Sequence, residues 1–242
     1  MKRLELDAGN SFIKWRLLEQ GRVRRRGSWL TAEFSAERLL ECGERPDRIW
    51  FASVAGEVFD RALQAGVERY WQVPLQRACA QAEAAGVRNS YKDPARMGVD
   101  RWLALLAAWH QVKDACWVVD CGSAITVDLL DAAGCHQGGY ILPGLRLMRQ
   151  ALLGNTAGVT VDRPVDSGVV MPGRDTSSGV EHGINLLLLS LARQLKNDIP
   201  GVADVPSRVL VTGGDGRQWL EVMPEAEWCP DLVMDGLRWA LE

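Results

Sequence analysis

The sequence is poor in the residues that build metal centres and disulfide frameworks. It contains three histidines in 242 residues, and its six cysteines are scattered without any C-x-x-C pair. Structural zinc sites need Cys and His ligands at short, regular spacings, so we expect no zinc site. The scattered cysteines predict a reduced, cytoplasmic protein.

Long hydrophobic runs are also absent. The longest apolar helical stretch, residues 184–192, is far shorter than the ~20 residues needed to span a bilayer. Lys2, Arg3, Glu5 and Asp7 all fall within the first seven residues, which leaves no apolar core for a signal peptide. We therefore expect a protein that does not associate with a membrane.

Neither sign of charge dominates the chain. The 28 basic and 31 acidic residues give a formal net charge of −3, which provides no overall attraction to nucleic acid. The basic run RVRRR at residues 22–26 is the local exception. It is either the solvated face of an edge strand or a binding patch, and we prefer the edge strand because such strands commonly carry charge.

The residues that are present fit an α/β protein. Apolar residues make up 47% and charged residues 24%, and the length allows one large domain or two small ones. Strand patterns alternate with helical patterns in two similar halves. We expect strands at residues 4–6, 12–17, 21–29, 48–55, 115–131 (a strand pair), 138–144 and 208–212, and helices at residues 32–42, 57–69, 98–112, 145–153, 176–197 and 231–241.

Two strand–turn–strand segments resemble each other. At a fixed offset of 113 residues, Asp7 aligns with Asp120 and Gly9 with Gly122. Coincidence is one explanation, because turns favour both residue types. Duplication explains more, because the same offset also aligns Asn10 with Ser123, Leu17 with Leu130 and Gly21 with Gly134.

A D-x-G turn of this kind suits phosphate chemistry. Glycine lets the backbone approach an anion, and successive N–H groups can converge on it. The aspartate can hold the cation that phosphates bring, while Lys14 supplies a positive charge on the outgoing strand. We call residues 7–14 the first D-x-G turn and residues 120–126 the second, and expect them to face each other across a cleft. The sequence has neither G-x-x-x-x-G-K-[ST] nor G-x-G-x-x-G, which excludes a P-loop and a dinucleotide fingerprint.

The complete motif set resembles the acetate/sugar kinase, heat-shock ATPase and actin superfamily, and within it the type III pantothenate kinases. The resemblance spans nearly the whole chain. It depends on D-x-G-N-[ST]-x-x-K at residues 7–14, Tyr91, G-x-D-R at 98–101, D-x-G-[ST]-A-x-T at 120–126, GGxIxPG at 138–144, Thr176 with Gly183, and Gly213-Gly214-Asp215. The chain departs from the pattern at Ser123, where most relatives carry threonine, and in the T-A-x-L-P element, which survives only partly at residues 156–160.

The resemblance implies a fold, an activity and a set of partners. It implies duplicated ribonuclease-H-like (actin-like ATPase) domains, each with a central mixed sheet, at residues 1–113 and 114–242, with a cleft between them. The activity would be phosphorylation of pantothenate by ATP, the first step of coenzyme A biosynthesis. Mg²⁺ would accompany ATP, a monovalent cation (K⁺ or NH₄⁺) would be required, and the protein would be a homodimer that binds neither nucleic acid nor membrane.

Site residues follow from the same resemblance. Asp100 would be the general base, and Asp120 would bind the monovalent cation. The pantothenate pocket would comprise Tyr91, Gly98, Val99, Asp100, Arg101 and Thr176. The ATP-binding residues would be Asp7, Ala8, Gly9, Asn10, Ser11, Phe12, Ile13, Lys14 and Ser123.

Several of these residues have simpler interpretations. Asp100 begins a helix, where an acid complements the helix dipole, and Thr176 lies where a helix cap is expected. Ser178 with Glu181 three residues later has the pattern of a capping box. We also expect Asp128 to be an exposed strand residue, although it could support the cleft, and His110 to pack or lie at the surface.

Two other functions remain open from the sequence. The chain could be a nucleotide-binding regulatory relative with a reduced active site, or a kinase of the same fold that phosphorylates a sugar or another small hydroxy acid. The presence of Lys14, Asp100, Arg101 and Asp120 argues against the first. The G-x-D-R motif with a nearby tyrosine argues against the second, because it provides for a carboxylate in the substrate.

Overall fold

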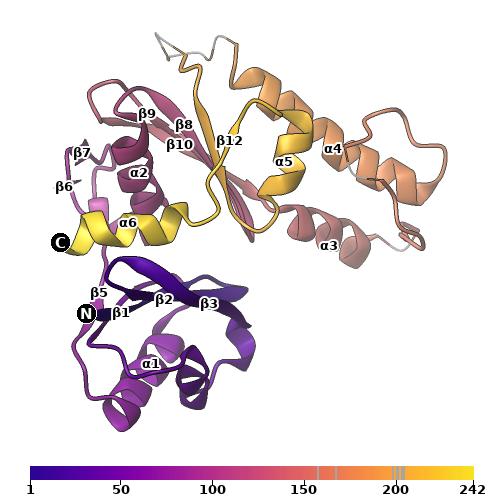
Figure 1. Cartoon of the computed structure of the whole chain (residues 1–242). Helices are drawn as coiled ribbons and strands as arrows, with labels where there is room; N and C mark the ends of the chain where they lie inside the picture. Colours follow the sequence, from indigo (N-terminus) through magenta and orange to yellow (C-terminus); the bar gives the residue numbers. More distant parts are fainter. Residues whose placement is uncertain (157, 167, 198, 200–201, 203–204) are drawn as a thin grey trace. The chain divides into compact units, whose positions relative to one another are not determined.

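The computed structural model describes residues 1–156, 158–166, 168–197, 199, 202 and 205–242 (Figure 1). The chain forms two compact units, one of residues 1–110 with 231–242 and the other of residues 111–230. Each unit contains a five-stranded mixed sheet with helices, so the expected duplicated α/β fold is confirmed.

The sheet of the first unit has the order β3-β2-β1-β4-β5. Strands β1, β2 and β3 form an antiparallel meander, and β4 and β5 add to it in parallel. The edge position and exposed arginines of β3 confirm the edge-strand interpretation of the basic run. The bounds are β1 Lys2–Ala8, β2 Phe12–Glu19, β3 Arg22–Leu30, β4 Arg48–Ser53 and β5 Leu75–Arg77.

Alternation along β1 decides what each face of this sheet carries. Leu4 and Leu6 are fully buried in an apolar core with helix α1 (Glu57–Tyr70) and the 3₁₀ helix η2 (Ala36–Cys42). Asp7 and Glu5 point to the opposite face, where helix α6 (Leu232–Leu241) contacts β1 and β4. Helix α2 (Val99–Val112) runs beside α6 (Figure 1) and carries Asp100. The remaining elements of this unit are η1 Thr31–Glu33, β6 Glu83–Ala84, β7 Val87–Arg88 and η3 Pro94–Arg96.

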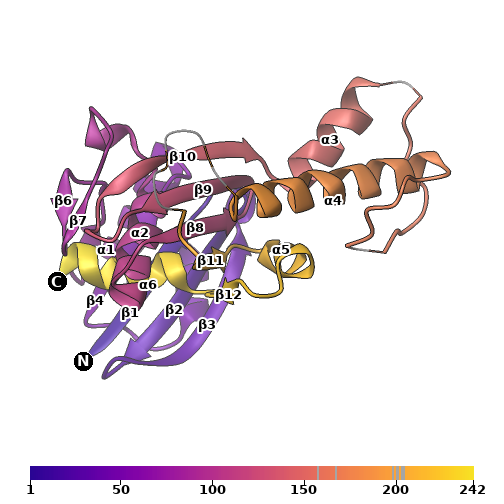
Figure 2. The same cartoon turned by 90° about the horizontal axis from the view of Figure 1, so that it is seen from above.

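The second unit repeats the arrangement, with the sheet order β10-β9-β8-β11-β12. Its apolar core contains Trp117, Val119 and Trp219, each at most 1% exposed. Helices α3 and α4 lie side by side beyond the end of β10 (Figure 2). The bounds are β8 Cys116–Cys121, β9 Ala124–Leu130, β10 His136–Pro143, α3 Leu145–Asn155, α4 Thr176–Gln194, β11 Val209–Thr212, α5 Gly216–Val222 and β12 Glu227–Trp228.

The two sheets support the predicted duplication. In each, three antiparallel strands precede two parallel strands that a helix connects, α1 in the first unit and α5 in the second. The fixed offset of 113 fails after the turn, however. Asp7 lies opposite Lys14, whereas Asp120 lies opposite Thr126, because the second turn is one residue shorter. Leu17 therefore corresponds to Leu129 and not to Leu130.

Several local expectations need correction. The helical pattern at residues 32–42 forms two short 3₁₀ helices, η1 and η2. The cap of α4 is Asp175, whose carboxylate accepts the Ser178 N–H in a reciprocal capping box, and Glu181 takes no part in it. Asp128 is not exposed: it is 2% exposed and bonds His136 at 2.9 Å. Ala157, in the partly retained T-A-x-L-P element, lies outside the described residues.

The final helix does not belong to the domain in which we expected it. We expected residues 114–242 to form one domain, but residues 231–242 group with the first unit. The buried apolar face of α6 contacts β1 and β4 of that unit, and Arg16 Nη1 on β2 also bonds Asp235 Oδ1 on α6 at 2.6 Å. Within the described ranges, no helix combines the length and hydropathy that crossing a membrane requires.

Candidate functional site

The first D-x-G turn is a tight connection between β1 and β2. The Gly9 N–H donates to the Phe12 carbonyl at 3.0 Å, and Ala8 pairs with Ile13 at the base of the turn. Thr31, at the end of β3, braces the turn from outside: its N–H donates to the Ser11 carbonyl at 3.0 Å and its hydroxyl to the Gly9 carbonyl at 2.8 Å. Sequence analysis did not predict a role for Thr31, because a threonine after a strand has no distinctive pattern.

Asp7 and Lys14 lie opposite each other in the β1–β2 ladder, on the sheet face that α6 contacts. Burial raises the pKa of Asp7 to about 6; the positive charge of Lys14 opposes that rise, and the nearby negative charge of Asp100 adds to it. The three predicted site residues are therefore close enough to interact electrostatically. The positive charge of Lys14 therefore does not fully offset the effect of burial on the Asp7 carboxylate. Such shifted pKa values are common where a cation or ligand binds.

The segment of residues 98–101 holds Asp100 at the first turn of α2. Asp100 Oδ1 accepts the Arg101 N–H at 2.8 Å, and the Trp102 N–H bonds the Gly98 carbonyl at 3.0 Å. A Cβ at position 98 would lie 2.6 Å from Asp100 Oδ1, so glycine leaves the room that this carboxylate occupies. Asp100 therefore lies in the first turn of α2, where its negative charge complements the helix dipole as expected. A catalytic role for Asp100 is compatible with this position.

Arg101 points inward and is 6% exposed. Its Nη1 donates to the Tyr91 hydroxyl at 2.8 Å, while the Tyr91 N–H is fixed by Asn89 Oδ1 at 3.0 Å. The structure thus brings together the two residues predicted to bind a carboxylate. A buried guanidinium oriented by a phenol suits that task, because a planar fork matches the two oxygens of a carboxylate. Val99, between Gly98 and Asp100, is buried against the core.

The second D-x-G turn is packed between two glycine segments. The Gly122 N–H donates to the Ala124 carbonyl at 2.9 Å, and the Gly144 N–H to the Ser123 carbonyl at 3.1 Å. A Cβ at Gly144 would collide with the Gly122 and Ser123 carbonyls, and one at Gly213, where φ is +92°, with Cys121 and Asp120. Only glycine allows these close approaches. The GGxIxPG and Gly213-Gly214-Asp215 motifs therefore both meet the second turn.

Charges of both signs surround this turn. The Asp215 N–H donates to the Cys121 carbonyl at 2.9 Å. Burial raises the pKa of the Asp215 carboxyl, and the positive charges of Arg149 and Arg146 oppose that rise. Arg149 itself forms a two-pronged ion pair with Glu181, both contacts being 2.7 Å.

The donors at the second turn are oxygens. Asp120 offers a carboxylate, and the neighbouring turn carries several backbone carbonyls. Across the described residues, no group of three or more His, Cys, Asp or Glu side chains could hold a metal ion. Carboxylate and carbonyl oxygens suit hard cations, whereas the softer transition metals prefer nitrogen or sulfur ligands.

Among the predicted pocket residues, Thr176 belongs to the second unit, whereas Tyr91 and residues 98–101 belong to the first. It is the first residue of α4, directly after the Asp175 cap, and it is exposed. The cap expected in this segment is therefore Asp175 and not Thr176. Because Thr176 belongs to the second unit and Tyr91 and Arg101 to the first, its place in a shared pocket stays a prediction.

Comparisons with known proteins agree on one family. Residues 3–197 match the family model described as type III pantothenate kinase. A type III pantothenate kinase of Ectopseudomonas mendocina is 38% identical over 243 residues, which cover 97% of this chain and 96% of that protein.

Solved structures share the fold at lower identity. A Campylobacter jejuni protein assigned to the Baf family of transcriptional activators gives a TM-score of 0.60 at 21% identity, covering 97% of this chain and 95% of that one. A Sinorhizobium meliloti protein assigned as a 2-dehydro-3-deoxygalactonokinase also gives 0.60, at 14% identity and with 98% and 97% coverage. These likenesses establish the architecture, and the family follows from the sequence relationship over nearly the full length: the chain belongs to the type III pantothenate kinases.

Proposed function

We propose that this protein transfers the γ-phosphoryl group of ATP to pantothenate, giving ADP and 4′-phosphopantothenate at the first step of coenzyme A biosynthesis. Besides family membership, one observation carries the proposal. The Asp7–Lys14 rung lies within electrostatic reach of Asp100, and Asp100 is adjacent to the buried Arg101, which bonds the half-buried Tyr91. A phosphate-binding turn, a candidate base and a carboxylate-binding pair thus occur in one unit.

The acceptor side is assigned to residues 98–101 and Tyr91. Arg101 would bind the pantothenate carboxylate through two hydrogen bonds, with Tyr91 fixing its orientation. Thr176 would complete the pocket. Asp100 would accept the proton of the primary hydroxyl as its oxygen attacks the γ-phosphorus and the bond to the β–γ bridging oxygen breaks. The Arg101 N–H on Asp100 Oδ1 keeps that carboxylate in place.

The nucleotide side is assigned to the two D-x-G turns. Backbone N–H groups of residues 8–13 and the ammonium of Lys14 would bind the phosphates, and the Ser123 hydroxyl would contact them from the second turn. Mg²⁺ would arrive with ATP and neutralise charge on its phosphate oxygens. Asp120 would bind K⁺ or NH₄⁺, for which its carboxylate and the adjoining carbonyls are suitable donors.

We also propose a homodimer formed through the second unit. Large apolar side chains are exposed on β10 and α4: Ile141 at 64%, Leu187 at 60%, Leu186 at 50% and Tyr140 at 46%. A cavity of about 740 Å³ is lined by residues 139–142, by the last turn of α4, and by Leu195 and Ile199 after it. An exposed apolar surface of this kind marks an interaction site, and sedimentation velocity measures whether it joins two copies.

A coupled assay for ADP tests the proposed activity. Purified protein with ATP, Mg²⁺ and K⁺ should release ADP only when pantothenate is present, and replacing K⁺ by Na⁺ should lower the rate. A panel of sugars and small hydroxy acids serves as the control for acceptor identity. ADP release with a panel member but not with pantothenate would refute the assigned acceptor, and nucleotide binding without turnover would favour a regulatory protein.

A further inference from the structure

Helix α6 connects the helix that carries Asp100 to the sheet that carries Asp7. It contacts strands β1 and β4, and its Gly236 touches the backbone of Leu103 in α2. In the view of Figure 1, α6 lies between α2 and the strands of the first unit. The distance from Asp100 to the Asp7–Lys14 rung therefore depends on how closely these two helices approach each other.

Gly236 lets the two helix backbones touch because it has no side chain. A Cβ at this position would lie 2.1 Å from the Leu103 carbonyl oxygen and 2.5 Å from the Leu103 carbonyl carbon. Both atoms belong to the backbone, so no side-chain rotation would relieve the collision. Glycine disfavours a helix interior more than any residue except proline, so helix formation does not explain its place in the middle of α6.

A second contact joins the same two helices. The ring of His110 on α2 stacks on the ring of Trp239 on α6, with the ring centroids 3.4 Å apart and the planes within 7° of each other. This stack lies about two helical turns along α2 from the Gly236 contact, so the two contacts together fix the direction of α2. The hydrogen bond between Arg16 and Asp235 holds α6 in turn to the sheet.

A displacement of α2 at Leu103 would also displace Asp100. Asp100 precedes Leu103 by about one helical turn on the same helix. With alanine at position 236, the separation between the new Cβ and the Leu103 carbonyl oxygen must grow from 2.1 Å to at least 3.0 Å. A misplacement of about 1 Å in an active site can lower the rate of a reaction about 100-fold.

We propose that Gly236 is a positioning residue, whose contact with Leu103 sets the distance between the Asp100 carboxylate and the first D-x-G turn. The consequence for catalysis rests on the proposed kinase function, whereas the distance itself is a property of the first unit. The competing explanation is that Gly236 only lets α6 pack. Its replacement would then lower stability and leave the rate per folded molecule unchanged.

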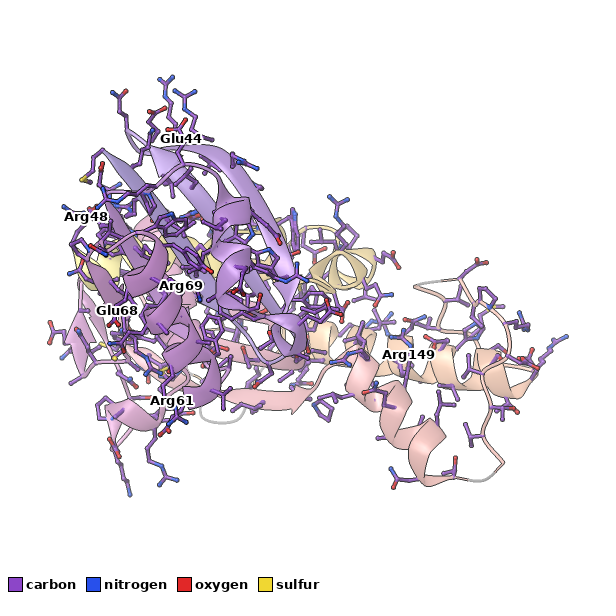
Figure 3. All side chains as sticks on the ribbon, turned by 90° about the horizontal axis from the view of Figure 1, so that it is seen from below. Glu44, Arg48, Arg61, Glu68, Arg69 and Arg149 are labelled. Atoms are coloured by element: carbon purple, nitrogen blue, oxygen red, sulfur yellow. The ribbon has the colours of Figure 1, made fainter. Side chains whose placement is uncertain are left out.

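The kinetics of Gly236→Ala separate the two explanations, once urea unfolding has shown that the variant is folded. The kcat for pantothenate phosphorylation should fall about 100-fold. The Kd for ATP, measured by calorimetry, should not change, because the first D-x-G turn belongs to β1 and β2 and stays in place. Gly154→Ala is the matched control in α3, the helix that carries Arg149 in Figure 3. A Cβ at Gly154 has no neighbour within 4 Å, so this variant should keep the wild-type kcat and Kd.

A second variant keeps the inference testable if Gly236→Ala does not fold. Trp239→Ala removes the ring that stacks on His110 and adds no collision. Its kcat should also fall while its Kd for ATP stays unchanged, because α2 is then held less firmly against α6. A wild-type kcat in the folded variant would overturn the inference.

The titration of Asp7, followed by ¹³C NMR of its carboxyl group, reports the same distance and requires no activity. Asp100→Asn should lower the pKa of Asp7, because it removes a nearby negative charge. Gly236→Ala should lower it as well, because the added methyl group moves α2 and Asp100 away from the sheet. An Asp7 pKa equal to that of the wild type, or a wild-type kcat, would overturn the inference. If the wild type does not phosphorylate pantothenate, the proposed function fails and the Asp7 titration alone decides the role of Gly236.

Discussion

Asp7 shows how the fold changes the acidity of a single predicted site residue. Its carboxylate lies on the α6-facing side of β1, and burial together with Asp100 raises its pKa to about 6 in spite of Lys14. An acid with a raised pKa holds its proton more tightly in the folded than in the unfolded state. Stability therefore falls as pH rises from about 4 to about 6, and the penalty is complete above that window.

Asp7→Asn should remove this penalty. In the absence of ligands at pH 7.5, the variant should be more stable than the wild type by up to about 3 kcal/mol, the equivalent of two pKa units. At pH 4 the difference should approach zero, because the wild-type carboxyl is then largely protonated. Urea unfolding at both pH values measures the effect. If the variant and the wild type differed in free energy of unfolding by the same amount at both pH values, the charge of Asp7 would not destabilise the protein.

For single residues, the sequence identified the candidate site residues better than the residues that support them through hydrogen bonds. Asp7, Lys14 and Asp100 were predicted from motifs, and the structure brings them into electrostatic contact. Thr31 was not predicted as a structural support, and Asp128, which is buried and bonds His136, was expected to be exposed. Their hydrogen bonds join separate strands, and no local pattern of residues encodes which strand end will meet which turn.

Among the elements, α6 has the most unexpected position. It follows β12 of the second unit yet contacts β1 and β4 of the first. Its attachment includes a buried ionic network, in which Glu5 accepts Arg3 Nε at 2.8 Å and Arg16 Nε at 2.6 Å, and Arg16 also bonds Asp235 of α6. Burial lowers the pKa of Arg16, but the carboxylates of Glu5 and Asp235 outweigh it and raise the pKa, so this cation stays charged.

Arg16→Gln should therefore destabilise the protein strongly. The substitution leaves Glu5, which is fully buried, with a weakened counterion, and breaking such a pair costs about 3 kcal/mol. Arg24→Gln is the control on the neighbouring strand: its pair with Glu19 is exposed and should contribute little. The free energy of urea unfolding compares the two, and equal losses would mean that the network does not anchor α6.

The sequence predicted which helices and strands form better than it predicted the unit to which each belongs. The amphipathic periods predicted α1, α2, α3, α4 and α6, and the alternation predicted the β1–β2 and β8–β9 hairpins. The short strands β5 and β12 and helix α5 were missed, because two to seven residues carry too little periodicity. That α6 belongs with the first unit follows from long-range packing and ion pairs, which periodicity does not reveal.

For the molecule as a whole, duplication is the organising feature. Two sheets with the same strand order each present a D-x-G turn at the same connection. The copies have diverged in their surroundings: the first turn has Lys14 and the Asp100 segment, and the second has Asp120 among carbonyls with α3 against it. The sequence alignment revealed the repeat but misplaced Leu17 by one residue, because the lengths of the two turns differ.

We propose that this molecule phosphorylates pantothenate with Asp100 as the general base. The most direct measurement is ³¹P NMR of ATP, Mg²⁺, K⁺ and pantothenate with wild-type protein and, in parallel, with Asp100→Asn. The wild type should produce ADP together with the phosphate monoester signal of 4′-phosphopantothenate. Asp100→Asn should bind ATP normally and form this product at least ~100-fold more slowly. Absence of the monoester signal with the wild type would contradict the proposed activity, and an undiminished rate in the variant would show that Asp100 is not the base.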